Sequence, residues 1–202
     1  SVNIPASPAF DFGTQDFTIE FYVKTNASNL QTVISKGTTV GPGYHISMQA
    51  GAIVVAIYDG ISPPVVINGI LSLSDGQWHH VAVVFARAGN ATIYTDGFFD
   101  NDGTIAAIGS VTNTDIVMVG SDVLTGIPSH YFSGYLDEMR IWNKALSVAE
   151  INASRVTHIN PNSVTNLVGY WDMNDLPGGI IIDCSPSGAN GVLVNSASFS
   201  AD

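Results

Sequence analysis

Basic side chains are scarce in this sequence. Among its 202 residues there are 6 Lys and Arg against 17 Asp and Glu, which gives a formal net charge of −11 at pH 7. Recognition of phosphate backbones depends on clustered Lys and Arg, so we expect no nucleic-acid partner. Anionic membrane surfaces are disfavoured for the same reason. The surplus of carboxylates suits either an acidic soluble surface or bound Ca²⁺, which prefers oxygen ligands.

Cysteine and long apolar runs are lacking as well. Cys184 is the only cysteine, so no internal disulfide can form and a zinc site made of several thiolates is excluded. No apolar run in the sequence reaches the roughly 20 residues that span a bilayer, and we expect no membrane insertion. Hydrophobic residues make up 46% and charged residues 11%, which excludes a disordered chain and a Glu- and Lys-rich helical bundle.

Catalytic motifs are also missing. The sequence has no Gly-x-Ser-x-Gly elbow, no His-Glu-x-x-His zinc motif and no phosphate-cradling Gly loop with Lys. Glycoside hydrolysis needs two acids that flank one bond, and no E-x-D-x-E run occurs. The neighbours Asp137 and Glu138 are expected to point to opposite faces of one strand. We therefore predict that the chain is not an enzyme.

What the sequence does contain is a series of short alternating segments. Residues 17–23 place four apolar side chains on one face and polar side chains or Tyr on the other. Gly, Asn and Pro separate this segment from the other expected strands, at residues 32–35, 44–48, 52–58, 78–85, 91–95, 115–119 and 135–142. This pattern predicts an all-β fold, an antiparallel sandwich of two sheets.

One short helix and a tail follow these strands. Ser147 and Glu150 form a capping box, which predicts a short helix within residues 143–151. The tail then resumes with apolar runs at residues 167–172 and 179–183. It is either a second unit cut short or a set of strands that completes the same sandwich. Because it is too short to bury a core alone, we predict one domain over residues 1–202, with residues 160–202 completing the sandwich.

Three blocks carry a resemblance to a known family. They are GQWHHVAVVF, ATIYTDG and SGYLDEMRIWNKALSVAEI. Their order and spacing, between Phe17 and Ile151, resemble the laminin-G-like, concanavalin A-like jelly rolls, and most closely the pentraxin-like branch. The resemblance implies a jelly-roll sandwich in which function lies on the loops at the rim rather than in the strands.

The Trp-His-His stretch at the start of an expected strand is interpreted as architecture. Side chains alternate along a strand, so His79 and His80 point to opposite faces and cannot chelate one ion together. We also expect Trp78, Trp142 and Trp171, which lie within or beside the family-like blocks, to pack in the core instead of stacking on a sugar.

Candidate ligand-binding residues come from three segments taken as rim loops, at residues 58–64, 98–103 and 120–131. Sugar hydroxyls suit carboxylate and amide acceptors, and the apolar face of a sugar suits an aromatic ring. The predicted carbohydrate-binding residues are Asp59, Asn101, Asp102, His130 and Tyr131. Residues 100–103, Asp-Asn-Asp-Gly, also resemble a fragment of a Ca²⁺ loop, with a solvated hairpin turn as the alternative.

Calcium is the predicted cofactor, and its ligands follow from the resemblance. Asp122 matches a position where pentraxin-like proteins place a calcium ligand, although further acids are missing from residues 123–131. Asp137 matches a position that often holds a structural Ca²⁺ in relatives, and Asp183 with Asn190 could complete such a site. The alternative is that Asp137 and its neighbour pair with nearby basic residues while Asp183 caps a turn.

These residues predict a lectin-like module that binds glycans or glycoconjugates, with calcium. Two alternatives stay open: a calcium-dependent protein-interaction or adhesion module, and a non-catalytic module of a larger glycan-active enzyme. We expect an extracellular or cell-surface location. The sequence specifies neither the sugar nor the oligomeric state.

Overall fold

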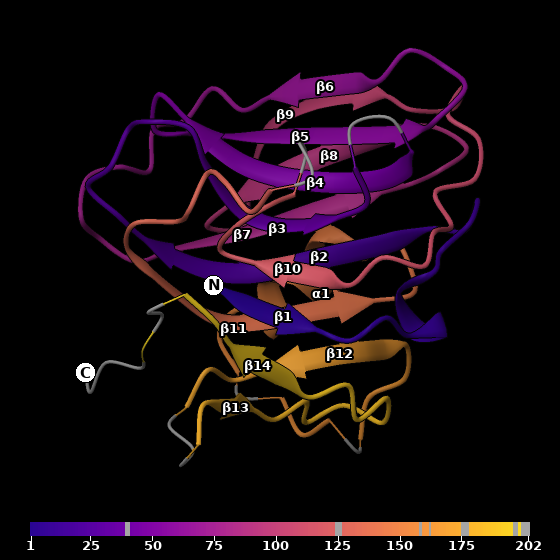
Figure 1. The fold of residues 1–202 in the computed structure, drawn as a ribbon. Coiled ribbons are helices and arrows are strands. Elements are labelled where there is room, and N and C mark those ends of the chain that lie inside the picture. The colour runs from indigo at the N-terminus through magenta and orange to yellow at the C-terminus, as the bar shows by residue number, and fades with distance from the viewer. Residues whose placement is uncertain are drawn as a thin grey trace.

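Two antiparallel sheets lie face to face, with the larger sheet in front in Figure 1. The computed structural model describes residues 1–38, 41–123, 127–157, 159–161, 163–174, 178–195 and 198. The eight-stranded sheet has the order β13 (Ile180–Ile181), β14 (Gly191–Leu193), β1 (Val2–Ile4), β10 (Val117–Val119), β3 (Gln31–Lys36), β4 (Pro42–Gln49), β5 (Ala52–Asp59) and β6 (Val65–Asn68). The six-stranded sheet has the order β12 (Leu167–Trp171), β11 (Tyr135–Trp142), β2 (Phe17–Lys24), β7 (His79–Phe85), β8 (Asn90–Thr95) and β9 (Phe98–Thr104). The predicted all-β sandwich is confirmed.

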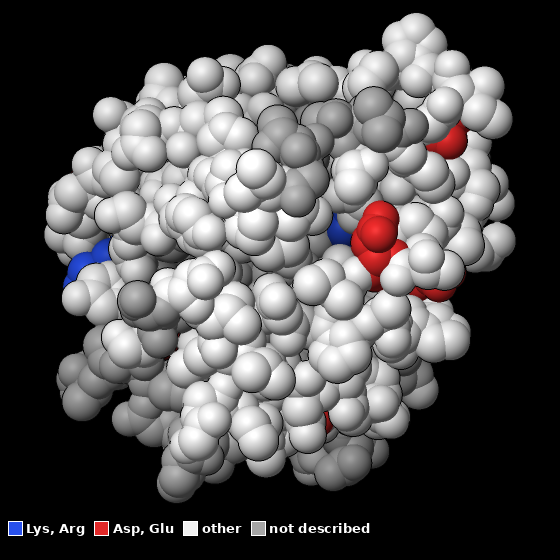
Figure 2. Space-filling model, viewed as in Figure 1, with Lys and Arg blue, Asp and Glu red and all other residues white. Residues whose placement is uncertain are grey.

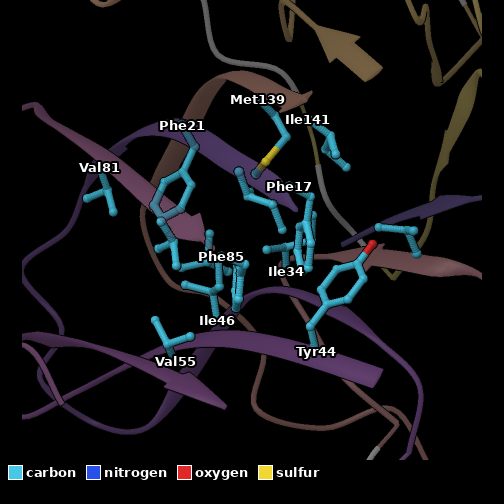
Figure 3. Packing of buried hydrophobic residues seen from close by; sticks show 14 of the residues in the cluster. Phe17, Phe21, Ile34, Tyr44, Ile46, Val55, Val81, Phe85, Met139 and Ile141 are labelled. Carbon is cyan, nitrogen blue, oxygen red and sulfur yellow. The ribbon is translucent and has the colours of Figure 1, made fainter. Parts of the chain in front are cut away.

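The alternating segments form strands because their apolar faces bury one another between the sheets. In β2, the four predicted inward side chains are fully buried, and β7 supplies Phe85 opposite Phe17. The Phe17 ring stacks on Phe85 at 4.1 Å and on Phe12 at 4.3 Å between ring centroids. Tyr44 from β4 packs against Phe17 from the other sheet, and Figure 3 shows these rings meeting at the centre of the core. Stacked aromatic pairs of this kind add to the burial of their apolar area.

A second apolar layer covers the outer face of the six-stranded sheet. It contains the helix α1 (Val148–Ser154), which begins at the predicted capping box, where Ser147 and Glu150 bond each other's backbone. Ile151 of α1 packs in one cluster with Trp142 and Tyr170. Trp142 and Trp171 are buried, as predicted. A short 3₁₀ helix, η1 (Pro8–Phe10), precedes β2. None of the helices in the described part of the chain is long and apolar enough to cross a membrane.

The tail contributes strands to both layers. β12 pairs with β11 at the edge of the six-stranded sheet, and β13 and β14 extend the eight-stranded sheet beside β1. The assignment of residues 1–202 to one domain stays a prediction.

The segment 98–103 differs from the sequence analysis, because it is a strand and not a rim loop. Asp96 and Gly97 adopt positive φ values of 53° and 82°, which closes a hairpin and sends the chain back as β9 along β8. A bulge in this ladder turns Asp100 inward, where its buried carboxylate accepts hydrogen bonds from the backbone N–H groups of Ile70 and Leu71. The expected hairpin turn at residues 100–103 is therefore wrong, while calcium binding there stays a prediction.

The aromatic stack generates a test of the core. Phe85→Ala should lower the free energy of unfolding by about 3–5 kcal/mol, because it opens a cavity beside Phe17. Urea denaturation followed by circular dichroism measures this change. Phe98→Ala is the matched control, since Phe98 is 73% exposed and its truncation should change stability by less than about 0.5 kcal/mol. Equal costs for the two variants would contradict the packing described here.

Candidate functional site

A pocket of about 640 Å³ opens at the end of the sandwich where β2 and β10 finish and β11 begins. We call it the rim pocket. Both sheets and the tail form its walls, since its lining includes Val2 and Val119 from one sheet and Leu136 from the other. The aromatic and polar side chains of its lining are Ser1, Trp78, Tyr131, Phe132, Tyr135, Asp137, Asn174, Asn195 and Ser198.

Aromatic rings form one wall of the rim pocket. The centroids of the Trp78 and Tyr135 rings are 6.2 Å apart, with an angle of 56° between the planes. Tyr135 is 48% exposed and Tyr131 is 46% exposed, while Trp78 is half-buried. The expectation that Trp78 packs in the core is wrong, because β7 begins one residue later, at His79, and leaves the indole at the rim.

The backbone at the start of β11 brings these rings together. Gly134 has a φ of 149°, and a Cβ atom at this position would lie 2.4 Å from the carbonyl oxygen of Lys24. Only glycine allows the chain to approach the end of β2 so closely. Further along β11, Asp137 accepts a hydrogen bond from the N–H of Glu138 at 2.8 Å, at a bulge where Glu138 has a φ of 50°.

The two histidines beside Trp78 serve different faces of β7. His79 lies between two carboxylates, with Nδ1 2.9 Å from Asp96 and Nε2 3.1 Å from Asp75. His80 is buried on the opposite face, 3.5 Å from Glu20. The prediction that they cannot chelate one ion together agrees with this geometry.

The structure brings together only part of the predicted carbohydrate-binding set. Tyr131 lines the rim pocket, and His130 precedes it in the same segment. Asp59 lies at the other end of the sandwich, because β5 runs away from the rim pocket. Asn101 and Asp102 lie along β9, where Asn101 donates to the carbonyl of Asn68 and Asp102 accepts from Asn90.

Asp59 has a role in a turn. Its carboxylate accepts hydrogen bonds from the backbone N–H groups of Gly109 at 2.6 Å, Ser62 at 2.6 Å and Ile61 at 2.8 Å. These bonds, that from Gly109 foremost, hold the pKa of the Asp59 carboxyl far below its usual range. The side chain thus fixes the end of β5 to the segment around Gly109.

Asp122, a predicted metal ligand, is the centre of a buried network. Its carboxylate is 0% exposed and accepts hydrogen bonds from Thr32 at 2.6 Å, Ser129 at 2.8 Å and His130 at 2.9 Å. His45 Nε2 lies 3.3 Å away. Burial alone would raise the pKa of Asp122, but the surrounding donors, led by His45, outweigh it and hold this pKa well below the usual range. The network anchors the described part of the connection between β10 and β11, which presents Tyr131 to the rim pocket.

The other predicted metal ligands are also engaged with protein donors. One oxygen of Asp183 accepts the N–H groups of Tyr170 and Ser185, and its other oxygen accepts the Ser187 hydroxyl and the Ala189 N–H. Asn190 accepts the N–H of Asp183 itself. Asp183 therefore caps a turn. Beside Asp137, Glu138 forms an ion pair with Arg140 and accepts the Tyr170 hydroxyl.

These arrangements do not fit a calcium site of the predicted composition. Asp122 and Asp183 are buried among N–H and O–H donors, whose positive ends face the carboxylates and would repel a cation. Within the described residues, no group of three or more His, Cys, Asp or Glu side chains could hold a metal ion. Asp137 alone among the four predicted ligands lines the rim pocket. Calcium binding stays a prediction from the sequence that these donor sets disfavour, and the proposed function does not depend on it.

The Asp122 network generates a pH-dependent prediction. Asp122→Asn should lower the free energy of unfolding at pH 7 by about 1–3 kcal/mol, because charge-assisted hydrogen bonds are lost. A carboxyl whose pKa is depressed by folding stabilises the protein above its unfolded pKa of about 3.9, and this contribution is lost as the pH falls further. The difference from wild type should therefore shrink below about pH 4.

Urea denaturation at a series of pH values measures that difference. Asp115→Asn, which alters an exposed carboxylate, is the matched control and should leave stability nearly unchanged. Wild-type stability in Asp122→Asn at pH 7 would contradict the anchoring role.

The hydrogen bonds already made by the predicted calcium ligands generate a second prediction. Neither Ca²⁺ nor EDTA should move the thermal unfolding midpoint, because the predicted ligands already have protein partners. Differential scanning fluorimetry measures the midpoint, with Mg²⁺ as the control for ionic strength. A midpoint that falls in EDTA and recovers in Ca²⁺, but not in Mg²⁺, would restore the predicted structural ion.

Comparisons with known proteins agree with this architecture. The rat Sushi, von Willebrand factor type A, EGF and pentraxin domain-containing protein 1 is 24% identical over 126 residues, which make up 59% of this chain and 4% of that protein. A Bacteroides ovatus protein, described provisionally as carbohydrate-binding, superposes with a TM-score of 0.73 at 20% identity. That match covers 95% of this chain and 55% of the other.

A heptameric SAP-like pentraxin from Limulus polyphemus superposes with a TM-score of 0.54 at 17% identity, over 75% of this chain and 79% of the pentraxin. The chain thus spans about half of the Bacteroides protein and a small part of the rat protein. The laminin-G-type family profile described as the concanavalin A-like lectin/glucanases superfamily matches residues 1–152. The resemblance seen in the sequence is confirmed, and this chain belongs to the concanavalin A-like lectin/glucanase superfamily.

Proposed function

We propose that this chain is a lectin-like module that binds glycans in the rim pocket. The observation that carries the proposal is the convergence of exposed aromatic rings with amide and carboxylate groups in one concavity. Trp78, Tyr131 and Tyr135 offer surfaces for the apolar faces of sugar rings. Asp137 and Asn174 offer oxygen acceptors for hydroxyl groups, and the Asn174 amide can also donate.

The size of the rim pocket supports a short oligosaccharide or the end of a glycan chain. Its volume of about 640 Å³ lies within the roughly 300–1,000 Å³ of small-molecule sites. The similarity in fold to the Bacteroides ovatus protein, whose provisional description is carbohydrate-binding, adds support at the level of ligand class.

Binding without hydrolysis is the activity that the pocket favours. Hydrolysis of a glycosidic bond needs two carboxyl groups, about 5–10 Å apart, across the scissile bond. Asp137 is the one acid among the described residues that line the rim pocket. The neighbouring Glu138 is engaged with Arg140 and Tyr170. We therefore propose a non-catalytic module, although the superfamily as a whole includes glucanases.

The protein around this module is a separate part of the proposal. The rat relative contains this type of domain as 4% of its length, which supports use as one module among several. We propose an extracellular or cell-surface location and glycans or glycoconjugates as partners. Two alternatives are a module that adheres to a protein ligand at the same rim and a non-catalytic module of a larger glycan-active enzyme. The domains on either side of this module in a longer chain would distinguish them.

Substitution of the aromatic wall tests the proposal. Trp78→Ala and Tyr135→Ala should each abolish binding on a glycan array, because the sugar loses its stacking surface. Phe98→Ala removes a more exposed ring from β9, outside the rim pocket, and should bind like wild type. The thermal midpoint of each variant controls for folding.

Asn101→Ala separates this site from the sequence-based prediction. Asn101 lies on β9 and does not line the rim pocket, so its loss should leave binding intact. Glycan binding that survives Trp78→Ala and Tyr135→Ala but is lost in Asn101→Ala would move the site to β9. A wild-type protein that binds no glycan would overturn the proposed function.

A further inference from the structure

One cation stands at the aromatic wall of the rim pocket. The Lys24 ammonium, at the end of β2, lies 5.9 Å from the centroid of the Trp78 ring and 5.8 Å from that of Tyr135. At about 6 Å or less, a ring face attracts a cation through its quadrupole. The two rings thus hold the ammonium beside the surface on which a sugar would stack.

Lys24 differs from the other five cationic side chains of the protein. Lys36, Arg140 and Lys144 form ion pairs with Asp11, Glu138 and Glu150 respectively. Arg87 donates to backbone carbonyls, and Arg155 donates to Asn152. Within the described residues, Lys24 makes neither an ion pair nor a side-chain hydrogen bond. Its three donors are free to bind a ligand.

Positive charge is scarce elsewhere on this protein, so the position of Lys24 bears on which ligands can bind. Charged side chains are sparse on the face shown in Figure 2, and the formal net charge of the protein is −11. A general attraction for anions is therefore absent, and an anionic ligand would be favoured only where a local positive charge can reach it. Lys24 does not itself line the rim pocket, but it is the cation that lies against two of the rings that do, Trp78 and Tyr135.

We propose that the rim pocket selects glycans that carry one acidic group, a carboxylate or a sulfate, and that Lys24 recognises this group. The inference rests on the proposed function and adds the class of sugar. In the bound state, a sugar ring stacks on Trp78 or Tyr135, and its acidic substituent accepts a charge-assisted hydrogen bond from the ammonium. Asp137, elsewhere in the pocket lining, receives hydroxyl groups of the same glycan.

The same charges set a limit on the ligand. Densely sulfated chains would place further anionic groups near Asp137 and the acidic surface, where like charges repel. Screening reaches about 10 Å at 0.1 M salt, so this repulsion acts on neighbouring residues of a polyanion and spares a single acidic group held at Lys24. The expected ligand is an acidic sugar within an otherwise neutral glycan.

Calorimetric titration with matched oligosaccharides tests the inference. The probes are a neutral oligosaccharide chosen from the glycan array, its counterpart with one hexose replaced by the hexuronic acid, and its monosulfated counterpart. Wild type should bind one or both acidic forms roughly 10- to 100-fold more tightly than the neutral form, the range expected for one charge-assisted hydrogen bond. Lys24→Gln should reduce this preference to near unity.

Two control variants sharpen the result. Lys24→Arg keeps the charge over the rings and should retain a preference for the acidic form. Arg155→Gln removes a cation whose guanidinium already bonds Asn152, and should behave like wild type. Preference in wild type should also decline with added salt. A comparison of the uronate and the monosulfate shows which acidic group is read.

The possible outcomes separate this inference from the proposed function. Equal binding of neutral and acidic forms by wild type, or an unchanged preference in Lys24→Gln, would overturn the inference and leave glycan binding at Trp78 intact. A wild-type protein that binds none of the three probes and no glycan on the array would overturn both.

Discussion

The inner faces of the two sheets must bury one another, and the position of every rim segment follows from that constraint. Phe17 and Phe85 from one sheet and Tyr44 from the other meet in the centre of the layer. Because the strands are antiparallel, packing them in this register brings the end of β2, the end of β10 and the start of β11 to the same edge. The rim pocket lies at that edge. An aromatic layer far from solvent thus decides which surface residues become neighbours.

Some carboxylates of this protein hold segments together and others face a pocket, and the sequence pattern does not distinguish the two roles. Asp59, Asp122 and Asp183 each accept several hydrogen bonds from backbone or side-chain donors, and each joins segments that are distant in the chain. Asp137 is the same residue type, yet it lines the rim pocket. The acidic surplus therefore contributes to internal order as well as to the surface.

The fold could be predicted from the sequence because its signals, such as alternation and helix capping, each lie within one element. Alternation in β2 and the capping box at Ser147 depend on residues within one element. The site depends on contacts such as Thr32 with Asp122, which no spacing encodes. The sequence predicts a loop in place of β9 because a run of Asp and Asn disfavours strands, whereas the bulge that buries Asp100 depends on N–H groups around residue 70.

Trp78, Tyr135, Asn174 and Lys24 all lie outside the predicted carbohydrate-binding set, and Trp78 and Lys24 do so for different reasons. The sequence predicts Trp78 in the core because it lies within a block that resembles the family, whereas β7 begins at His79 and leaves the indole at the rim. Lys24 carries a weaker signal, its position at the end of an alternating strand on the polar face. Gly134 is a further signal, since a glycine at a strand end can mark a close approach of the backbone. Residues at strand ends thus belong to the site, whereas several of the acids between strands do not.

The position of β1 within its sheet has a consequence for how the chain folds. This first strand lies between β10 and β14, with Val2 opposite Val119 on one side and Leu193 on the other. The Ser1 amine even donates to the carbonyl of Val194. The two neighbouring strands are made only after much of the polypeptide has been synthesised, so both edges of β1 stay unpaired until then. Pairing between strands so distant in the sequence makes folding slow. Until the last strands are made, the emerging chain depends on chaperones to protect its unpaired edges from aggregation.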